Sequence, residues 1–78
     1  MEIKVLGSGC SNCKRLYEYT KQAVDELDIT ANIVYVTDMI EIAKANLLRT
    51  PGLIINNHVV SYGRVPLVDE IKEMIKKA

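Results

Sequence analysis

The sequence predicts an α/β fold whose elements follow the order β-α-β-α-β-β-α, with helices on both faces of a four-stranded mixed sheet. Three observations predict it. Short segments rich in β-branched residues alternate with segments of helical period. The first two strands flank a helix, an order that favours parallel pairing through a right-handed crossover. The last two strands are separated only by turn residues, and all 78 residues are expected to form a single domain, 1–78.

The first strand and the first helix are predicted from the spacing of apolar residues, which changes after the Gly7-Ser8-Gly9 segment. Residues 3–6 form a short strand that ends at the flexible Gly7-Ser8-Gly9 segment. From residue 13 onward, apolar positions recur every three or four residues and predict an amphipathic helix of about four turns. Ser11 and Asn12 would lie in its first turn, where both residue types cap N–H groups. The apolar positions are Cys13, Leu16, Tyr17, Thr20, Ala23, Val24 and Leu27.

The middle of the chain predicts a second strand and a second helix. Residues 32–36 are β-branched or aromatic apart from Asn32 and predict a strand buried on both faces, parallel to the first. Asp38 and Glu41 have the spacing of a capping box and would begin a helix over residues 39–47. Thr50-Pro51-Gly52 ends this helix. Its apolar side is expected to pack in the core; the residues are Met39, Ile40, Ile42 and Ala43.

The last third of the chain predicts a hairpin and a helix. Residues 53–55 and 59–62 are strands that flank Asn56-Asn57-His58, because Asn tolerates the positive φ of tight turns. Pro66 is a favourable first residue for the last helix. Lys76 and Lys77 suit its C-terminal end. The predicted apolar face contains Leu67, Val68, Ile71, Met74 and Ile75.

Charge and hydropathy exclude several function classes. Ten Lys and Arg residues balance ten Asp and Glu residues without a run of like charges, so neither nucleic acid nor an anionic membrane is an expected partner. The longest uninterrupted apolar run has four residues and cannot cross a bilayer. No signal-peptide pattern opens the sequence. We therefore expect a cytoplasmic protein, in which cysteines are more often reactive or metal-binding than structural.

Cys10-Ser11-Asn12-Cys13 is the segment that carries chemistry. Cysteines three residues apart at a helix start lie on the same side, so their sulfurs can form a disulfide or point at one target. The helix dipole and unpaired N–H groups favour a thiolate at Cys10. Cys13 lies on the apolar face and is expected to be buried. The pattern predicts Cys10 as nucleophile and Cys13 as resolving thiol.

Other uses of the cysteine pair remain open. As a staple, the four-residue ring would add only about 2 kcal/mol of stability. Soft-metal binding or transfer is the main alternative, because two thiolates suit Cu(I) or Zn(II). A closed zinc site needs four ligands, and the lone His58 is expected in the hairpin turn. In a third interpretation the domain docks a partner and its thiols are incidental.

Thr50-Pro51 carries a second functional hypothesis. A proline that begins a strand can adopt the cis form, which leaves the preceding carbonyl and N–H free to pair with an extended peptide. The alternative is a helix stop followed by an ordinary turn.

Three motifs together resemble a known family. They are residues 5–13 (VLGSGCSNC), 50–56 (TPGLIIN) and 60–66 (VSYGRVP). In this order and at these distances they resemble the small, glutaredoxin-sized thioredoxin-like redox-active disulfide proteins of prokaryotes. The resemblance covers essentially the whole chain and implies a minimal thioredoxin fold with strand order 2-1-3-4.

The resemblance also implies roles for individual residues. Cys10 matches the nucleophile and Cys13 the resolving thiol, and Pro51 matches a cis-proline that faces them. The expected activity is thiol–disulfide exchange with protein or small-molecule disulfides, reset by an unidentified reductase, in a monomer without metal or organic cofactor. The expected substrate-binding residues are Thr50, Pro51, Gly63, Ser11 and Asn12.

Overall fold

The computed structural model describes residues 1–47 and 49–78. Its elements are β1 (Glu2–Leu6), α1 (Ser11–Leu27), β2 (Asn32–Val36), α2 (Met39–Lys44), β3 (Gly52–Ile55), β4 (His58–Tyr62) and α3 (Val68–Lys77). The strands form one sheet in the order β2-β1-β3-β4. β1 pairs parallel with β2 and antiparallel with β3, which pairs antiparallel with β4. The predicted fold class, element order and strand order are confirmed.

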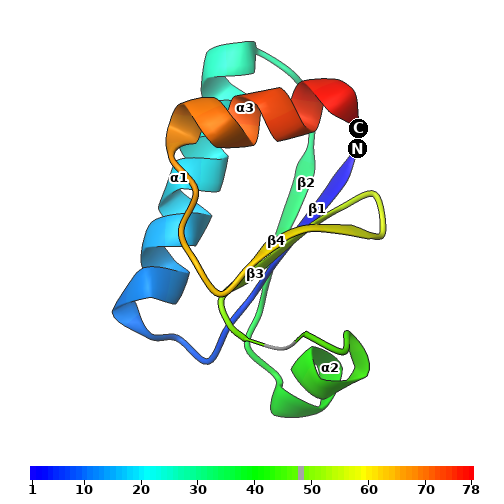
Figure 1. Cartoon of the computed structure of the whole chain (residues 1–78). Helices are drawn as coiled ribbons and strands as arrows, with labels where there is room; N and C mark the ends of the chain where they lie inside the picture. The colour runs from blue at the N-terminus through cyan, green and yellow to red at the C-terminus, as the bar shows by residue number, and fades with distance from the viewer. Residues whose placement is uncertain (48) are drawn as a thin grey trace.

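α1 and α3 cover one face of the sheet (Figure 1). The helical residues that repeat every three or four positions are the ones buried, as the period predicts. They pack against alternate residues of β1 and β3, because successive strand side chains point to opposite faces. This cluster is the main core and fixes how α1 lies on the sheet. Its buried members are Ile3, Val5, Leu16, Ala23, Val24, Leu53, Ile55, Ile71 and Ile75.

The opposite face is covered only in part, by α2. A helix of six residues is about 9 Å long, whereas a strand of five residues extends about 17 Å. α2 buries Ile42 against Leu6 and Ile54 but leaves Val34 and Val59 exposed by 38% and 45%. The expectation that residues 32–36 are buried on both faces is therefore wrong. β2 is an edge strand, and its α2-side face lies beyond the reach of the short helix.

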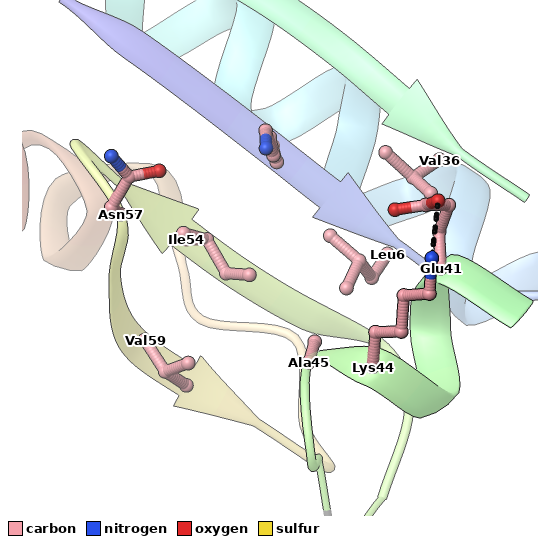
Figure 2. A pocket seen from close by; sticks show the side chains of 9 residues that line it. Leu6, Val36, Glu41, Lys44, Ala45, Ile54, Asn57 and Val59 are labelled. Atoms are coloured by element: carbon pink, nitrogen blue, oxygen red, sulfur yellow. Dashed lines mark ion pairs between the residues drawn. The ribbon is translucent and has the colours of Figure 1, made fainter.

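A cavity of about 280 Å³ opens between α2 and the sheet on this face. Figure 2 shows Leu6, Val36 and Ile54 of the sheet beneath α2, with Lys44 paired to Glu41 at the rim. Lys4 of β1 also lines this cavity, and its ammonium lies 3.7 Å from a carboxylate oxygen of Glu2. The lysine that interrupts the central strand thus sits on the face opposite α1.

α2 is shorter than expected. It ends at Lys44 and not at residue 47, since Asn46 takes a left-handed φ of 57° that the helix cannot continue. Met39 and Ile40 are each 65% exposed, so their predicted place in the core is wrong. A helix of fewer than two turns presents little more than one residue to the sheet, and here that residue is Ile42.

Two boundaries at the C-terminal side also differ from expectation. The hairpin is confirmed, but its turn consists of Asn56 and Asn57 alone, with φ values of 49° and 69°. His58 is the first residue of β4 and pairs with Ile55. α3 begins at Val68, not at residue 66, and Leu67 is its N-cap with 64% exposure. Leu67 therefore lies outside the buried face of the helix.

α1 and α3 are joined by an ion pair at their solvent side. Lys72 donates a hydrogen bond to a Glu26 carboxylate oxygen at 2.7 Å, and Gln22 donates to the other oxygen at the same distance. The hydrogen bond from Lys72, and secondarily that from Gln22, holds the pKa of Glu26 below its ordinary value. The hydrogen bond to Glu26 raises the pKa of Lys72.

A carboxyl group whose pKa is lower in the folded state stabilises the fold above its unfolded pKa, and this contribution is lost as the pH falls through the folded pKa. We expect the urea midpoint of the oxidised protein to fall below about pH 4.3, the unfolded value for Glu. The Glu26→Gln variant should have a lower midpoint at pH 7 and a smaller difference between pH 7 and pH 3. The control is Glu73→Gln, whose carboxylate pairs with Lys76 of the same helix. Equal pH dependence in wild type and Glu26→Gln would contradict the assignment.

Candidate active site

The turn between β1 and α1 sets the position of the two cysteines. The Gly7 N–H donates to the Val36 carbonyl at 3.0 Å and extends the pairing of β1 with β2 by one residue. Gly9 has a φ of +89°, a conformation that favours glycine. Cys10 is then extended, with φ −67° and ψ 167°, and forms the N-cap of α1. The strand end therefore places Cys10 directly at the N-terminus of the helix.

Cys10 and Cys13 form a disulfide. Their environments differ, because Cys10 is exposed whereas Cys13 is fully buried. The Cys13 N–H donates to the Cys10 sulfur at 3.2 Å, and the Lys14 N–H donates to the Cys10 carbonyl at 3.0 Å. Burial of Cys13 agrees with the sequence prediction. Ser11 and Asn12 lie in the first turn, as expected, and are exposed. The residue that caps the helix differs from expectation, because the acceptor is the sulfur of Cys10.

Gly7 lies directly against the buried cysteine. A Cβ atom at this position would overlap the Cys13 sulfur and come within 2.8 Å of the Cys13 Cβ. Any side chain at residue 7 must therefore displace Cys13 or the strand end. The sequence predicted only flexibility here, and nothing in a single sequence marks a glycine as a packing surface.

The sheet register brings Pro51 to the same place. Leu6 pairs with Gly52 in the antiparallel β1–β3 ladder, so the next position along each strand puts Gly7 opposite Pro51. Pro51 is buried, whereas Thr50 is exposed, and the peptide bond between them is cis. Pro51 and the cysteine pair, 38 residues apart or more in sequence, thus share one end of the sheet.

The segment after β4 closes the other side of Pro51. The Gly63 N–H donates to the Pro51 carbonyl at 3.0 Å, and Gly63 has a φ of +75°. A Cβ on Gly63 would lie 3.1 Å from the Cβ of Arg49 and 3.2 Å from its Cδ. The aliphatic stem of Arg49 therefore lies along the Gly63 backbone, a contact that the sequence did not indicate.

Arg64 is engaged in a different interaction. Its guanidinium donates to both carboxylate oxygens of Glu70, at 2.8 and 3.4 Å. Glu70 also accepts from the Leu67 N–H at 3.3 Å. The hydrogen bond from Arg64 lowers the pKa of Glu70, and the same hydrogen bond raises the pKa of Arg64. This pair ties the segment after β4 to the first turn of α3.

The described residues place no buried carboxylate and no metal-binding cluster beside the cysteine pair. Within residues 1–47 and 49–78, the buried polar side chains are Thr20 and Ser61, so the described core holds no carboxylate. The same residues contain no group of three or more Cys, His, Asp or Glu side chains placed to hold a metal ion. No helix in the described part of the chain has the length and apolar character needed to cross a membrane.

A disulfide between an exposed and a buried cysteine, at the N-terminus of the helix that follows β1, is the arrangement expected of a thiol–disulfide oxidoreductase. The comparisons with known proteins agree. The family model described as Thioredoxin domain matches residues 1–76. A thioredoxin of Methanocaldococcus jannaschii is 46% identical over 74 residues, which cover 95% of this chain and 85% of that protein. A thioredoxin of Methanothermobacter thermautotrophicus is 36% identical over 75 residues, which cover 96% and 97%.

The chain therefore belongs to the thioredoxin-domain family, and the resemblance inferred from its three motifs is confirmed. It is a thiol–disulfide oxidoreductase that uses the Cys10–Cys13 pair. Family membership indicates disulfides as substrates and a reductase as partner.

The packing of Gly7 gives a direct test of the site's construction. Gly7→Ala should reduce the free energy of unfolding of the oxidised protein by about 1–3 kcal/mol, the usual cost of adding a methyl group where no space exists. It should also slow formation of the internal disulfide, because Cys13 must move. Ser8→Ala, next to it but exposed, is the control. Urea unfolding measures the change in stability. The rate at which a disulfide reagent oxidises the reduced protein in the absence of air measures formation of the Cys10–Cys13 disulfide. Wild-type values for Gly7→Ala would show that Gly7 does not set the position of Cys13.

Proposed function

We propose that Cys10 attacks the substrate disulfide and that Cys13 resolves the resulting mixed disulfide. The observation that carries this assignment is the difference in exposure: the Cys10 side chain is open to a large partner, whereas Cys13 is completely buried. Only an accessible sulfur can attack a disulfide in another protein, and only a sulfur adjacent to it can displace the product.

The reaction balances within the two partners. The Cys10 thiolate attacks one sulfur of the substrate disulfide, forming a mixed disulfide and expelling the other substrate sulfur as a thiolate, which takes a proton. The Cys13 thiolate then attacks the Cys10 sulfur, and the second substrate thiol leaves. Two electrons and two protons pass from the dithiol to the substrate. A reductase must return both to the protein before the next cycle.

The backbone beside Pro51 is the proposed binding edge for an extended substrate segment. Thr50 is exposed and precedes buried Pro51, and no hydrogen bond of its amide or carbonyl occurs among residues 1–47 and 49–78. Gly63, which packs against the stem of Arg49, would lie beside this edge, and exposed Ser11 and Asn12 would form its helix side. An extended peptide that pairs with Thr50 would bring its sulfur toward Cys10.

The remaining features are proposed from the chemistry of the pair. A dithiol that turns over is suited to the cytoplasm, where a reductase can keep it reduced. The partners would be protein disulfides, and the protein would act as a monomer because the exchange needs only one cysteine pair. No metal or organic cofactor enters the proposed cycle.

The two single cysteine variants test the assigned roles. Cys10→Ser should reduce insulin-disulfide reduction to the uncatalysed background, because the attacking sulfur is absent. Cys13→Ser should form a mixed disulfide through Cys10 that persists and appears as a covalent adduct in a non-reducing gel or by mass spectrometry. The double variant is the control for adducts that do not involve the site.

If Cys13→Ser lost activity and Cys10→Ser trapped the mixed disulfide, the assigned roles would be contradicted, but the proposed thiol–disulfide exchange would stand. Full activity of both single variants would contradict the mechanism, and unchanged partner complexes with the double variant would favour a docking domain whose thiols are incidental.

A further inference from the structure

We propose that the rim around Cys10 selects disulfides that carry acidic residues beside the reacting cysteine. This inference rests on the proposed function and names the substrate class of the same site. The positive charges of the chain are neutralised by carboxylates away from Cys10 and are left without such partners beside it, among the described residues.

Half of the cationic side chains are matched by carboxylates. In the described part of the chain, five of the ten Lys and Arg residues lie within 4 Å of an Asp or Glu oxygen; they are Lys4, Lys44, Arg64, Lys72 and Lys76. Three of the other five belong to the segments that form the site: Lys14, Arg15 and Arg49. The overall charge of zero therefore conceals an uneven distribution.

Lys14 and Arg15 border the site on the helix side. Both are exposed, and they follow Cys13 directly along α1. The first turn of α1 contains no acidic residue. The helix N-terminus adds a partial positive charge of its own. Among the described residues, neither Lys14 nor Arg15 forms an ion pair with a carboxylate, so both charges add to the positive potential that an approaching substrate meets.

Arg49 borders the site on the strand side. It immediately precedes Thr50, the proposed binding edge, and its stem lies along Gly63 at the distances given above. This contact restrains the stem while the residue remains exposed. Arg64 lies in the same region, but its charge is matched by the bidentate contact with Glu70. Arg49 is therefore the cation of this segment that remains available to a substrate carboxylate.

Charges placed in this way act mainly on association. A cationic rim around an exposed sulfur attracts an acidic segment before any contact forms and opposes a basic one, so it changes the association rate and its salt dependence. At about 1 M salt the screening length is about 3 Å, and the preference should largely disappear.

The test compares three cyclic disulfide peptides that differ only in the two residues flanking one cysteine: Asp-Asp, Gln-Gln or Lys-Lys. The pre-reduced protein is mixed with each peptide, the reaction is stopped with acid, and the second-order rate constant of peptide reduction is determined by chromatography. At 20 mM salt we expect the Asp peptide to react about tenfold faster than the Lys peptide. At 1 M salt the ratio should approach one.

Matched variants locate the effect. Arg49→Gln and the double variant Lys14→Gln/Arg15→Gln should each reduce the ratio of Asp to Lys rates at low salt. Lys77→Gln removes the same charge at the far end of α3 and should leave the ratio unchanged. Equal rates for the Asp and Lys peptides at low salt, or an equal effect of Lys77→Gln, would overturn the inference. Failure to reduce even the Gln peptide would instead contradict the proposed function.

Discussion

The first N–H groups of α1 have no acceptor inside the helix, and the sulfur of Cys10 accepts one of them, from Cys13, at 3.2 Å. This contact does two things at once. It gives an otherwise unpaired backbone N–H a hydrogen-bond acceptor, which is why the helix can begin at residue 11 without a Ser, Thr or Asp cap. It also places partial positive charge beside the sulfur that we propose as the nucleophile. In this proposal, helix initiation and chemistry depend on the same atom.

The sheet supplies the other half of the arrangement. Because β1 pairs with β3 in a fixed antiparallel register, Gly7 and Pro51 lie opposite each other where the two strands leave the sheet. Gly7 gives Cys13 a surface without a side chain, and the Gly63 N–H holds the Pro51 carbonyl. The site is built on the ends of rigid elements, so its geometry follows from the register and not from a mobile loop. Figure 2 shows the opposite face, where Leu6, Val36 and Ile54 lie beneath α2.

Much of this could be predicted from the sequence, since the informative signals are local. The spacing of Leu16, Ala23 and Val24 gave the buried face of α1, and the two asparagines gave the hairpin turn. The predictions failed where tertiary context decides. Met39 and Ile40 belong to an apolar group expected on the buried side of a helix, but α2 is too short to bury them. A strand of β-branched residues does not reveal whether a helix will cover it, and so Val34 was placed in the core although it is exposed.

The sequence singles out the two cysteines and Pro51, whose roles in the reaction stay a prediction, but it does not reveal the contacts that support them. Cys10 caps the helix in place of Ser11 and Asn12. This was not predicted, because cysteine is not among the residue types that usually cap helices. The packing of Gly7 on Cys13 and of Arg49 on Gly63 joins residues whose proximity arises only when the chain has folded. Such contacts leave no periodic or compositional signal in one sequence.

We expect the position of Cys10 at the N-terminus of α1 to make its thiol acidic and accessible in the reduced protein. The most direct measurement is the pH dependence of alkylation of the reduced protein, with each modified cysteine identified by mass spectrometry. Cys10 should react first, with a rate that follows an ionisation clearly below about pH 8.5, the ordinary value for a thiol, while Cys13 remains protected. Alkylation of Cys13 first, or a Cys10 ionisation at or above the ordinary value, would contradict this expectation.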